Sequence, residues 1–432
     1  MIRTLPRKGI RFAGAVREEH RPELSTQSSL VPLTLPDKPS IAVLPFTNLS
    51  GEPEQDYFAD GMADEIITAL SRCSWLFVIA RNSSFTYKGK NVDVRQVARE
   101  LGVLYVVEGS VRRSKNRLRF TGQLIDATSG AHIWADRFDG QMGDVFDIQD
   151  RFTESIVAAI EPSIQLAEIA RLKRKPAANL DAYDLFLRAQ QLEYEFTERS
   201  LTAALSHLRQ ALAIDPNYAP AMALAAYCYA VRRNQGWASD LEAETAEGLR
   251  LIERATEIGK DDSNVMWMAA RVMWHLAQDA HRARELGYQS LQLNPNSAIA
   301  LAITAWAEVH LGNSRKSIEL CLRAERLNPR DPRGWMIATS FGIAHFVERR
   351  FDQAAACFEK ALVHNPRFTI ALRDLAASYA MLGEKEKAAA AVQKVLEIEP
   401  QLTLTKLRER TRFYAENWQG FAEGLRLAGL PE

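Results

Sequence analysis

Apolar residues in the second half of this chain recur every three or four positions, the spacing that predicts amphipathic helices. Prolines close these helical runs at regular intervals: Pro295, Pro329, Pro366 and Pro400 lie 34, 37 and 34 residues apart, each after a stretch such as SLQLN or VLEIE. A single helical hairpin of this length cannot bury its apolar face alone, so such hairpins stack side by side. The ladder of prolines therefore predicts an all-α solenoid.

The ladder also extends toward the N-terminus. Pro216 ends ALAIDP, and Asp261 stands 34 residues before Pro295, where a proline would be expected. The interval from Pro216 to Asp261 is 45 residues, so one repeat carries an insertion, which we place at Arg232–Glu242. Trp237 at its centre is predicted either to be an exposed contact residue or to pack back on the neighbouring hairpin.

Residues 38–165 show a different pattern, in which short extended runs alternate with helical ones. The segments Ser40–Phe46 and Leu76–Ala80 read as strands, and Phe58–Arg72, Asp93–Leu101 and Val145–Leu172 read as helices. Three further extended runs, VLYVVEGSVRR, RLRFTGQLIDA and AHIWADRFDG, are separated by turn residues and predict an antiparallel meander. This unit is therefore predicted to be an α/β domain, joined to the solenoid by a basic linker at 166–181.

Small and large residues inside the repeats carry a family resemblance. Gly342, Ala354, Phe358, Ala361 and Pro366 stand where the tetratricopeptide repeat has its characteristic small, large and proline positions. About six such repeats span 182–400, and 401–432 would form a capping pair of helices. The resemblance implies a right-handed solenoid that binds proteins rather than one that catalyses a reaction.

One repeat departs from the family pattern. Trp267 and Trp274 occupy the positions of large aromatics in its first helix, but Arg271 replaces the small residue expected between them.

The α/β unit carries a second resemblance. The segments IAVLPFTNLSGEPEQDYFADGMADEIITALSR, VRQVARELGVLYVVEGSVRR and FTGQLIDATSGAHIWADRFD are similar to the TolB-like amino-terminal domain, which in bacterial proteins commonly precedes tetratricopeptide repeats. The resemblance covers most of 38–150. It implies no defined reaction and brings no catalytic residues.

The segment 1–37 begins with a basic hairpin pattern. Ile2–Leu5 and Ile10–Ala13 would be strands around a turn of Arg7, Lys8 and Gly9. The pattern resembles the wing of the winged-helix domain of response regulators, in which Arg3, Arg7, Lys8 and Arg11 would contact phosphates. The recognition helix of such a domain would lie upstream of Met1. We therefore expect a mobile segment with only weak, salt-sensitive and sequence-independent affinity for DNA.

Composition indicates the cellular compartment and argues against some classes of binding partner. Lys plus Arg and Asp plus Glu number 54 each, so no overall field attracts nucleic acid or a membrane surface. The four cysteines lack metal-binding or redox spacing and suit a reducing cytosol. No run approaches the length of a membrane helix, and the N-terminus lacks the apolar core of a signal peptide. A cytoplasmic protein is predicted.

No motif predicts catalysis, a cofactor or a metal site. The sequence has no HExxH, GxSxG, GxxxxGK[ST] or GxGxxG pattern, and the carboxylates of Gly51–Glu65 do not follow a calcium-loop spacing. Class III nucleotide cyclases are sometimes built with the same modules, but no segment remains to house their catalytic domain. The sequence therefore predicts a protein that is not an enzyme.

These observations favour a regulatory interaction protein of bacterial signalling or transcription control. The alternatives are a DNA-binding regulator whose true start lies upstream, and an adenylate cyclase relative that lacks its catalytic domain. A partner protein or peptide would dock in the concave groove of the solenoid, unless the α/β domain or a second subunit fills it. The residues predicted to line this groove are Phe186, Tyr227, Val272, His275, Trp306, Phe346 and Arg373.

Overall fold

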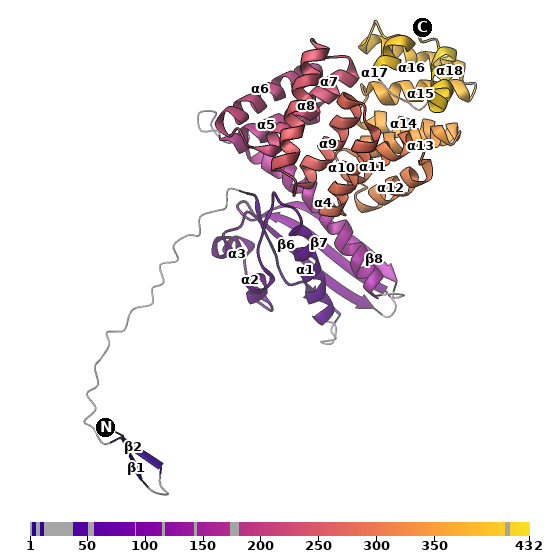
Figure 1. Cartoon of the computed structure of the whole chain (residues 1–432). Coiled ribbons are helices and arrows are strands. Elements are labelled where there is room, and N and C mark those ends of the chain that lie inside the picture. Colours follow the sequence, from indigo (N-terminus) through magenta and orange to yellow (C-terminus); the bar gives the residue numbers. More distant parts are fainter. Residues whose placement is uncertain are drawn as a thin grey trace.

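The computed structural model shows an α/β domain and a helical solenoid packed against one another, with a small hairpin at the N-terminus (Figure 1). It describes residues 2–5, 9–12, 38–50, 56–90, 92–114, 117–141, 145–172, 181–329, 331–410 and 415–432. No helix in these ranges is long and apolar enough to cross a membrane.

The N-terminal hairpin consists of β1 (Ile2–Leu5) and β2 (Gly9–Phe12), which pair antiparallel with Arg3 opposite Arg11. The two predicted strands are therefore confirmed, the second one residue earlier than expected. The turn with Arg7 and Lys8 and the linker 13–37 lie outside the described residues.

The α/β domain is built on one mixed sheet. Its strands are β3 (Ser40–Val43), β4 (Thr47–Asn48), β5 (Phe77–Val78), β6 (Tyr105–Ser114), β7 (Arg117–Asp126) and β8 (Ala131–Gln141). The order is β5-β3-β6-β7-β8, and β4 also pairs with β6. The pairs that β3 makes are parallel, whereas β6, β7 and β8 form the predicted antiparallel meander.

Helices cover both faces of this sheet. They are α1 (Asp56–Leu70), α2 (Arg81–Ser84), the 3-10 turn η2 (Phe85–Tyr87), α3 (Val94–Leu101) and α4 (Val145–Leu172). On one face α1 and α4 bury Phe58, Ile66 and Ile156 against the sheet, and on the other α3 buries Val97. Asp93 caps α3 by accepting from the Arg95 backbone, and Gly102 ends it with φ of 65°. The predicted helices are confirmed, but α2 and η2 were not predicted.

In its described residues, the solenoid contains six helical hairpins followed by two shorter helices. The hairpins are α5 (Ala182–Glu195) with α6 (Glu198–Ile214), α7 (Ala219–Gln235) with α8 (Leu241–Ile258), α9 (Ser263–Val272) and the π-helical η4 (Met273–Ala277) with α10 (Ala280–Leu293), α11 (Ala298–His310) with α12 (Ser314–Leu327), α13 (Gly334–Val347) with α14 (Phe351–His364), and α15 (Thr369–Met381) with α16 (Lys385–Ile398). The chain then forms α17 (Leu404–Arg410) and α18 (Ala415–Leu427). Each proline of the ladder follows the second helix of a hairpin, as predicted.

Close packing inside a hairpin explains the small residues of the repeat. A Cβ atom added at Gly342 on α13 would lie 2.6 Å from the ring of Phe358 on α14. That distance is shorter than van der Waals contact, so a larger residue would push the two helices apart.

The solenoid curls until its early and late repeats meet. Phe196 lies in the turn after α5. The centre of its ring is 5.0 Å from the ring centre of Trp335 on α13 and 5.7 Å from that of Phe368, the residue before α15. Gln235 at the end of α7 accepts a hydrogen bond from Thr369 at the start of α15. Figure 1 shows α17 beside α7, and Gln278 donates to the Glu409 backbone from the residue after η4. These contacts close the solenoid upon itself.

Candidate functional site

Six of the seven residues predicted to line an open groove are buried inside the closed solenoid. Tyr227 is fully buried, Trp306 is 5% exposed and Phe346 is 9% exposed. Val272, His275 and Arg373 are buried as well, and Phe186 is half-buried against Tyr218. The ring of Phe346 contacts that of Phe421 on α18, with 6.1 Å between their centres. In this structure the curl of the solenoid leaves no open aromatic groove at these described positions, and docking of a peptide on them stays a prediction.

Three of these residues border a small interior cavity of about 20 Å³. His275, Trp306 and Arg373 line it together with residues of α7, α11, α13, α15, α17 and α18. Asp374 lies beside Arg373, and burial raises its pKa to about 7, with Arg373 acting in the opposite direction. Burial also lowers the pKa of His275 well below its usual value, so this imidazole is neutral near pH 7.

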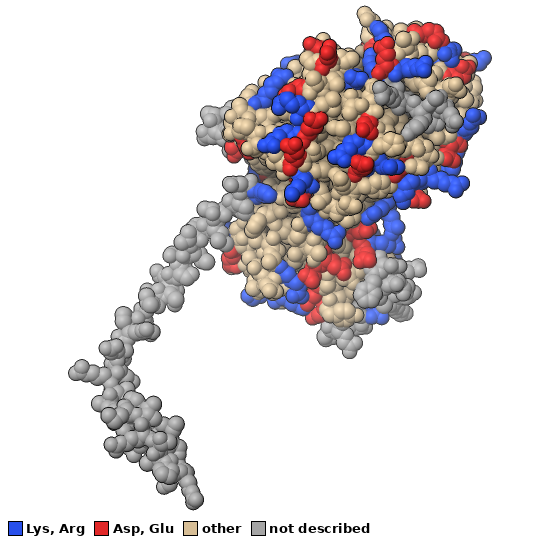
Figure 2. Space-filling view, in the orientation of Figure 1, with Lys and Arg blue, Asp and Glu red and all other residues tan. Residues whose placement is uncertain are grey.

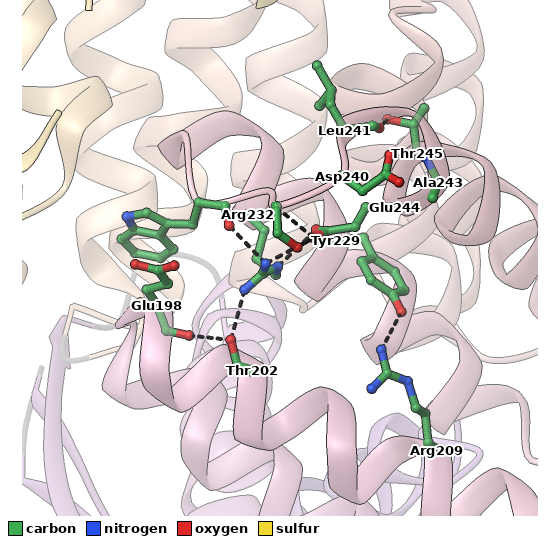
Figure 3. A network of polar contacts seen from close by, with 12 residues as sticks. Glu198, Thr202, Arg209, Tyr229, Arg232, Asp240, Leu241, Ala243, Glu244 and Thr245 are labelled. Carbon is green, nitrogen blue, oxygen red and sulfur yellow. Dashed lines mark hydrogen bonds and ion pairs between the residues drawn. The ribbon is translucent and has the colours of Figure 1, made fainter. Parts of the chain in front are cut away.

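The predicted insertion mostly lengthens α7 and α8. The turn between them begins at Gly236, whose φ of 76° ends α7. Arg232 holds this turn, because its guanidinium donates to both carboxylate oxygens of Glu244, at 2.9 Å each, and to the Trp237 carbonyl at 2.8 Å (Figure 3). The ring of Trp237 lies 6.0 Å from that of Phe196 on the neighbouring hairpin. The prediction that Trp237 packs back on that hairpin is confirmed.

The two domains meet along α4, which carries a proline at position 162 within the helix. Pro162 has no N–H, so the carbonyl of Ala158 lacks its helical donor. Asn328, in the turn after α12, donates its side-chain amide to this carbonyl at 3.2 Å. Asn294, one repeat earlier, donates to the buried carboxylate of Glu161 at 2.9 Å, and Trp75 donates to the same carboxylate at 3.4 Å. Asn-Pro turns of two consecutive repeats thus bind one helical turn of α4.

Beside this contact lies an open cleft of about 820 Å³. Its apolar lining comes from three elements: Trp134 and Phe138 from β8, Phe152 and Leu166 from α4, and Pro329 and Pro332 from the turn after α12. Within the described sheet β8 pairs with β7 alone, so its outer edge is unpaired. The cleft therefore runs beside a free edge of backbone donors and acceptors.

Arginines give this cleft a positive balance. Arg137, Arg151 and Arg326 line it and are exposed, and neither Arg151 nor Arg326 has an ion pair among the described residues. Of the two lining carboxylates, Asp139 is held by Arg119 at 2.7 Å. The wider surface shows no such bias: Figure 2 shows both signs of charge interspersed over the visible face of the solenoid.

Other predicted site residues receive no structural test. The side chains of Arg3 and Arg11 are not described, and Arg7 and Lys8 lie outside the described residues. Across the described ranges, no group of three or more His, Cys, Asp or Glu residues is arranged to hold a metal ion.

Sequence reasoning missed the Asn328 contact and the cleft beside β8. The Asn-Pro turns were visible in the ladder, and a proline within a predicted helix is a signal that some carbonyl needs an outside donor. Nothing in the local pattern pairs the two features.

Two protein families match parts of the chain. Residues 339–402 match the tetratricopeptide repeat family, and residues 37–155 match the HilA/YgeH-like transcriptional regulator, second domain. The C-terminal part of the chain carries tetratricopeptide-like helical repeats.

A curated relative is the putative adenylate cyclase 3 of Rhizobium meliloti (strain 1021), which is 52% identical over 192 residues. The match covers 44% of this chain and 33% of that protein, so the chain spans about a third of the relative's length.

Solved structures show more distant likenesses. A tetratricopeptide protein of Thermus thermophilus is 22% identical, with 43% of this chain and 92% of that chain covered and a TM-score of 0.34. TolB from Acinetobacter baumannii is 17% identical, with 31% of this chain and 30% of that chain covered and a TM-score of 0.22.

Proposed function

We propose that this chain is a non-enzymatic, cytoplasmic regulatory protein of bacterial signalling or transcription control, which acts by holding a partner protein. Its repeats are of a type used for protein interaction, and its α/β domain matches part of a transcriptional regulator family. The observation that carries the proposal is the cleft of about 820 Å³ between the free edge of β8, α4 and the turn after α12.

The cleft suits an extended acidic segment of the partner. An extended peptide can add to a free sheet edge through its backbone, while its side chains enter neighbouring pockets. Trp134 and Phe138 offer aromatic contacts of the kind that dominate binding energies. Arg151 and Arg326, which lack ion pairs among the described residues, attract carboxylates and would speed association.

The interior of the solenoid is the alternative docking surface, and it contains the groove residues named above. Its cavity of about 20 Å³ is far smaller than a peptide, so docking there requires the early and late repeats to separate. The larger volume of the cleft therefore favours it as the docking site.

Charge reversal in the cleft tests this proposal. Wild type and Arg151→Glu/Arg326→Glu are compared for partner capture from the source cell, and the captured partner is identified and titrated. We expect at least a tenfold loss of affinity, which corresponds to about 1.4 kcal/mol. Arg199→Glu, at an exposed arginine on α6, is the matched control.

Full affinity in the double variant would contradict docking in the cleft. Trp306→Ala and Phe346→Ala address the interior surface in the same assay, with circular dichroism to confirm folding. Loss of the partner in these folded variants alone would favour the interior.

A second candidate function is a DNA-binding transcriptional regulator. The match of residues 37–155 to the second domain of such regulators and the β1–β2 hairpin before it support this reading. A mobility-shift titration of this chain, and of a version extended upstream to the previous in-frame start, distinguishes the two. Sequence-selective binding by the chain as given, persisting at physiological salt, would favour the second candidate.

A third reading follows the name of the curated relative, in which the chain would be related to an adenylate cyclase but lack the catalytic domain. This reading shares with the first proposal the absence of catalysis, which incubation with ATP and Mg²⁺ tests, and we expect no cyclic AMP. Measurable turnover by the purified chain would overturn the non-enzymatic proposal.

A further inference from the structure

Two arginines are buried inside the closed solenoid without the partners that such groups need. Arg271 on α9 is 4% exposed and Arg373 on α15 is 3% exposed. The Nε and Nη1 atoms of each have no hydrogen-bond partner among the described residues. A buried guanidinium without hydrogen bonds or a counter-charge is strongly unfavourable, so these atoms require an explanation.

Further unpartnered donors lie beside them. The Trp306 Nε1 donor and the His275 Nε2 ring nitrogen, which donates or accepts according to its tautomer, have no partner within the described part of the chain. Both residues line the interior cavity with Arg373. The Arg271 guanidinium lies 4.3 Å from the centre of the Trp306 ring. Three side chains with unpartnered nitrogens, from η4, α11 and α15, therefore line one small space, and Arg271 lies beside it over the Trp306 ring.

Neighbouring carboxylates offset the charge of this cluster only in part, since Asp374 and Glu399 act on Arg373 without forming an ion pair with it. Glu399 already accepts from Arg410. Asp374 adjoins Arg373, but its raised pKa of about 7 leaves it about half protonated at pH 7 and largely protonated in mildly acidic solution. No ion pair joins Arg271 to a carboxylate of the described residues, and burial lowers its pKa to about 10. The interior thus carries an excess of positive charge.

Arg271 also departs from its repeat family. It stands between Trp267 and Trp274 where a small residue is expected, and its guanidinium packs over the Trp306 ring at the edge of the cavity. A long cation at this position fits a role in binding.

We propose that this cavity binds a small oxyanion, a phosphate or carboxylate group, between Arg373, His275 and Trp306, while Arg271, over the Trp306 ring, adds a second positive charge nearby. Oxyanions accept several hydrogen bonds at once and supply the missing negative charge. The volume of about 20 Å³ suits one small polar group rather than a peptide. Because the site joins early and late repeats, its occupancy would stabilise the closed solenoid, independently of the cleft beside β8.

Isothermal titration of the full chain with sodium phosphate, and separately with sodium acetate, tests this site at constant ionic strength set by chloride. We expect one saturable site for at least one of the two anions. The anion that binds more tightly shows whether the site prefers a phosphate or a carboxylate group. At a hundredfold excess over Kd, the anion should shift the unfolding equilibrium about 100-fold toward the folded state.

Arg373→Met and Arg271→Met remove the charge but keep an unbranched, largely apolar side chain, and Arg199→Met is the exposed control. We expect binding to be lost in both interior variants and kept in the control. Replacing an unpaired buried charge by an apolar residue is compatible with folding, and circular dichroism checks this. Absence of binding in wild type, which indicates a cavity filled by water only, overturns the proposal. Equal binding in the interior variants, which indicates adventitious surface binding, overturns it as well.

Discussion

The side-chain amide of Asn328 donates to the carbonyl of Ala158 at 3.2 Å, across 170 residues of sequence. This carbonyl is the one that Pro162 deprives of its helical donor. A proline that would otherwise leave a buried acceptor unsatisfied thus becomes the point where the solenoid recognises α4. This contact, together with that of Asn294 to Glu161, holds α4 against the solenoid beside the cleft.

Asn328→Ala should lower the free energy of unfolding by about 1–3 kcal/mol, because it leaves the buried Ala158 carbonyl without a partner. Urea denaturation measures the loss. Asn365→Ala is the matched control. Asn365 also precedes a ladder proline, but it is half-buried and lies in the turn after α14, one repeat beyond Asn328, so its loss should stay within about 0.5 kcal/mol.

A double-mutant cycle with Pro162→Ala isolates the contact. Alanine at this position restores an N–H for the Ala158 carbonyl, so Asn328→Ala should cost less in the Pro162→Ala background than in wild type. Equal costs in both backgrounds would show that Asn328 acts through its other contact, a hydrogen bond to Asp331 at 3.1 Å.

Local patterns predicted most of the elements because each one follows from its own residues. The proline ladder placed the six hairpins, and the alternation in RLRFTGQLIDA placed β7. The predicted helix Val145–Leu172 is confirmed with the same ends. These features depend on contacts within a few tens of residues, which periodicity and turn residues report well.

Closure of the solenoid could not be predicted in the same way. It results from small rotations added over successive repeats, and it brings Gln235 to Thr369, which are 134 residues apart. For that reason the sequence placed Trp306 and Phe346 on the inner side but could not show that they are buried. Arg271, by contrast, was visible in the sequence as a departure from its repeat, and the structure places it in the interior over the Trp306 ring.

Trp237→Ala should destabilise the solenoid, because the Trp237 ring packs against Phe196 where the early and late repeats meet. Full truncation of a core tryptophan costs about 3–5 kcal/mol, and for this half-buried ring we expect about 2 kcal/mol. That corresponds to a fall in Tm of roughly 4–8 °C by thermal scanning. Tyr57→Ala is the control, since that side chain is 75% exposed and its removal should leave Tm nearly unchanged.

Arg333 and Glu193 form a buried ion pair that joins α13 to α5, with Nη2 donating to Oε2 at 2.7 Å. Arg333→Ala should cost about 3–5 kcal/mol, because it strands the Glu193 carboxylate in the interior. The Arg333→Met/Glu193→Met double variant should recover much of this loss. Arg250→Ala, which breaks the exposed pair with Glu247, should cost less than about 1 kcal/mol by the same urea titration.

A double variant as unstable as Arg333→Ala alone would indicate that the loss comes from other Arg333 contacts. The candidates are its hydrogen bond to the Tyr194 hydroxyl at 3.0 Å and its stacking on Trp267.

Asp374 should make the stability of the solenoid depend on pH in the direction opposite to that of a salt-bridged acid. Its pKa is about 7 in the folded chain, chiefly through burial, against about 4 for an unfolded aspartate. Between these values the folded state keeps a proton that the unfolded state releases, so the free energy of unfolding falls as pH rises. Asp374→Asn removes this dependence. From pH 4 to pH 7, the free energy of unfolding of the variant should therefore rise relative to that of wild type by up to about 4 kcal/mol.

Urea titrations of wild type and Asp374→Asn at a series of pH values measure this difference, which we expect to level off above pH 7. Asp261→Asn, on an exposed turn, is the control and should run parallel to wild type. The comparison is made in chloride buffer, because an oxyanion bound beside Arg373 would add its own charge to the site. A difference in free energy of unfolding between wild type and Asp374→Asn that stays constant across this range would mean that Asp374 is already charged and paired with Arg373. The interior would then carry less excess positive charge than its unpartnered arginines indicate.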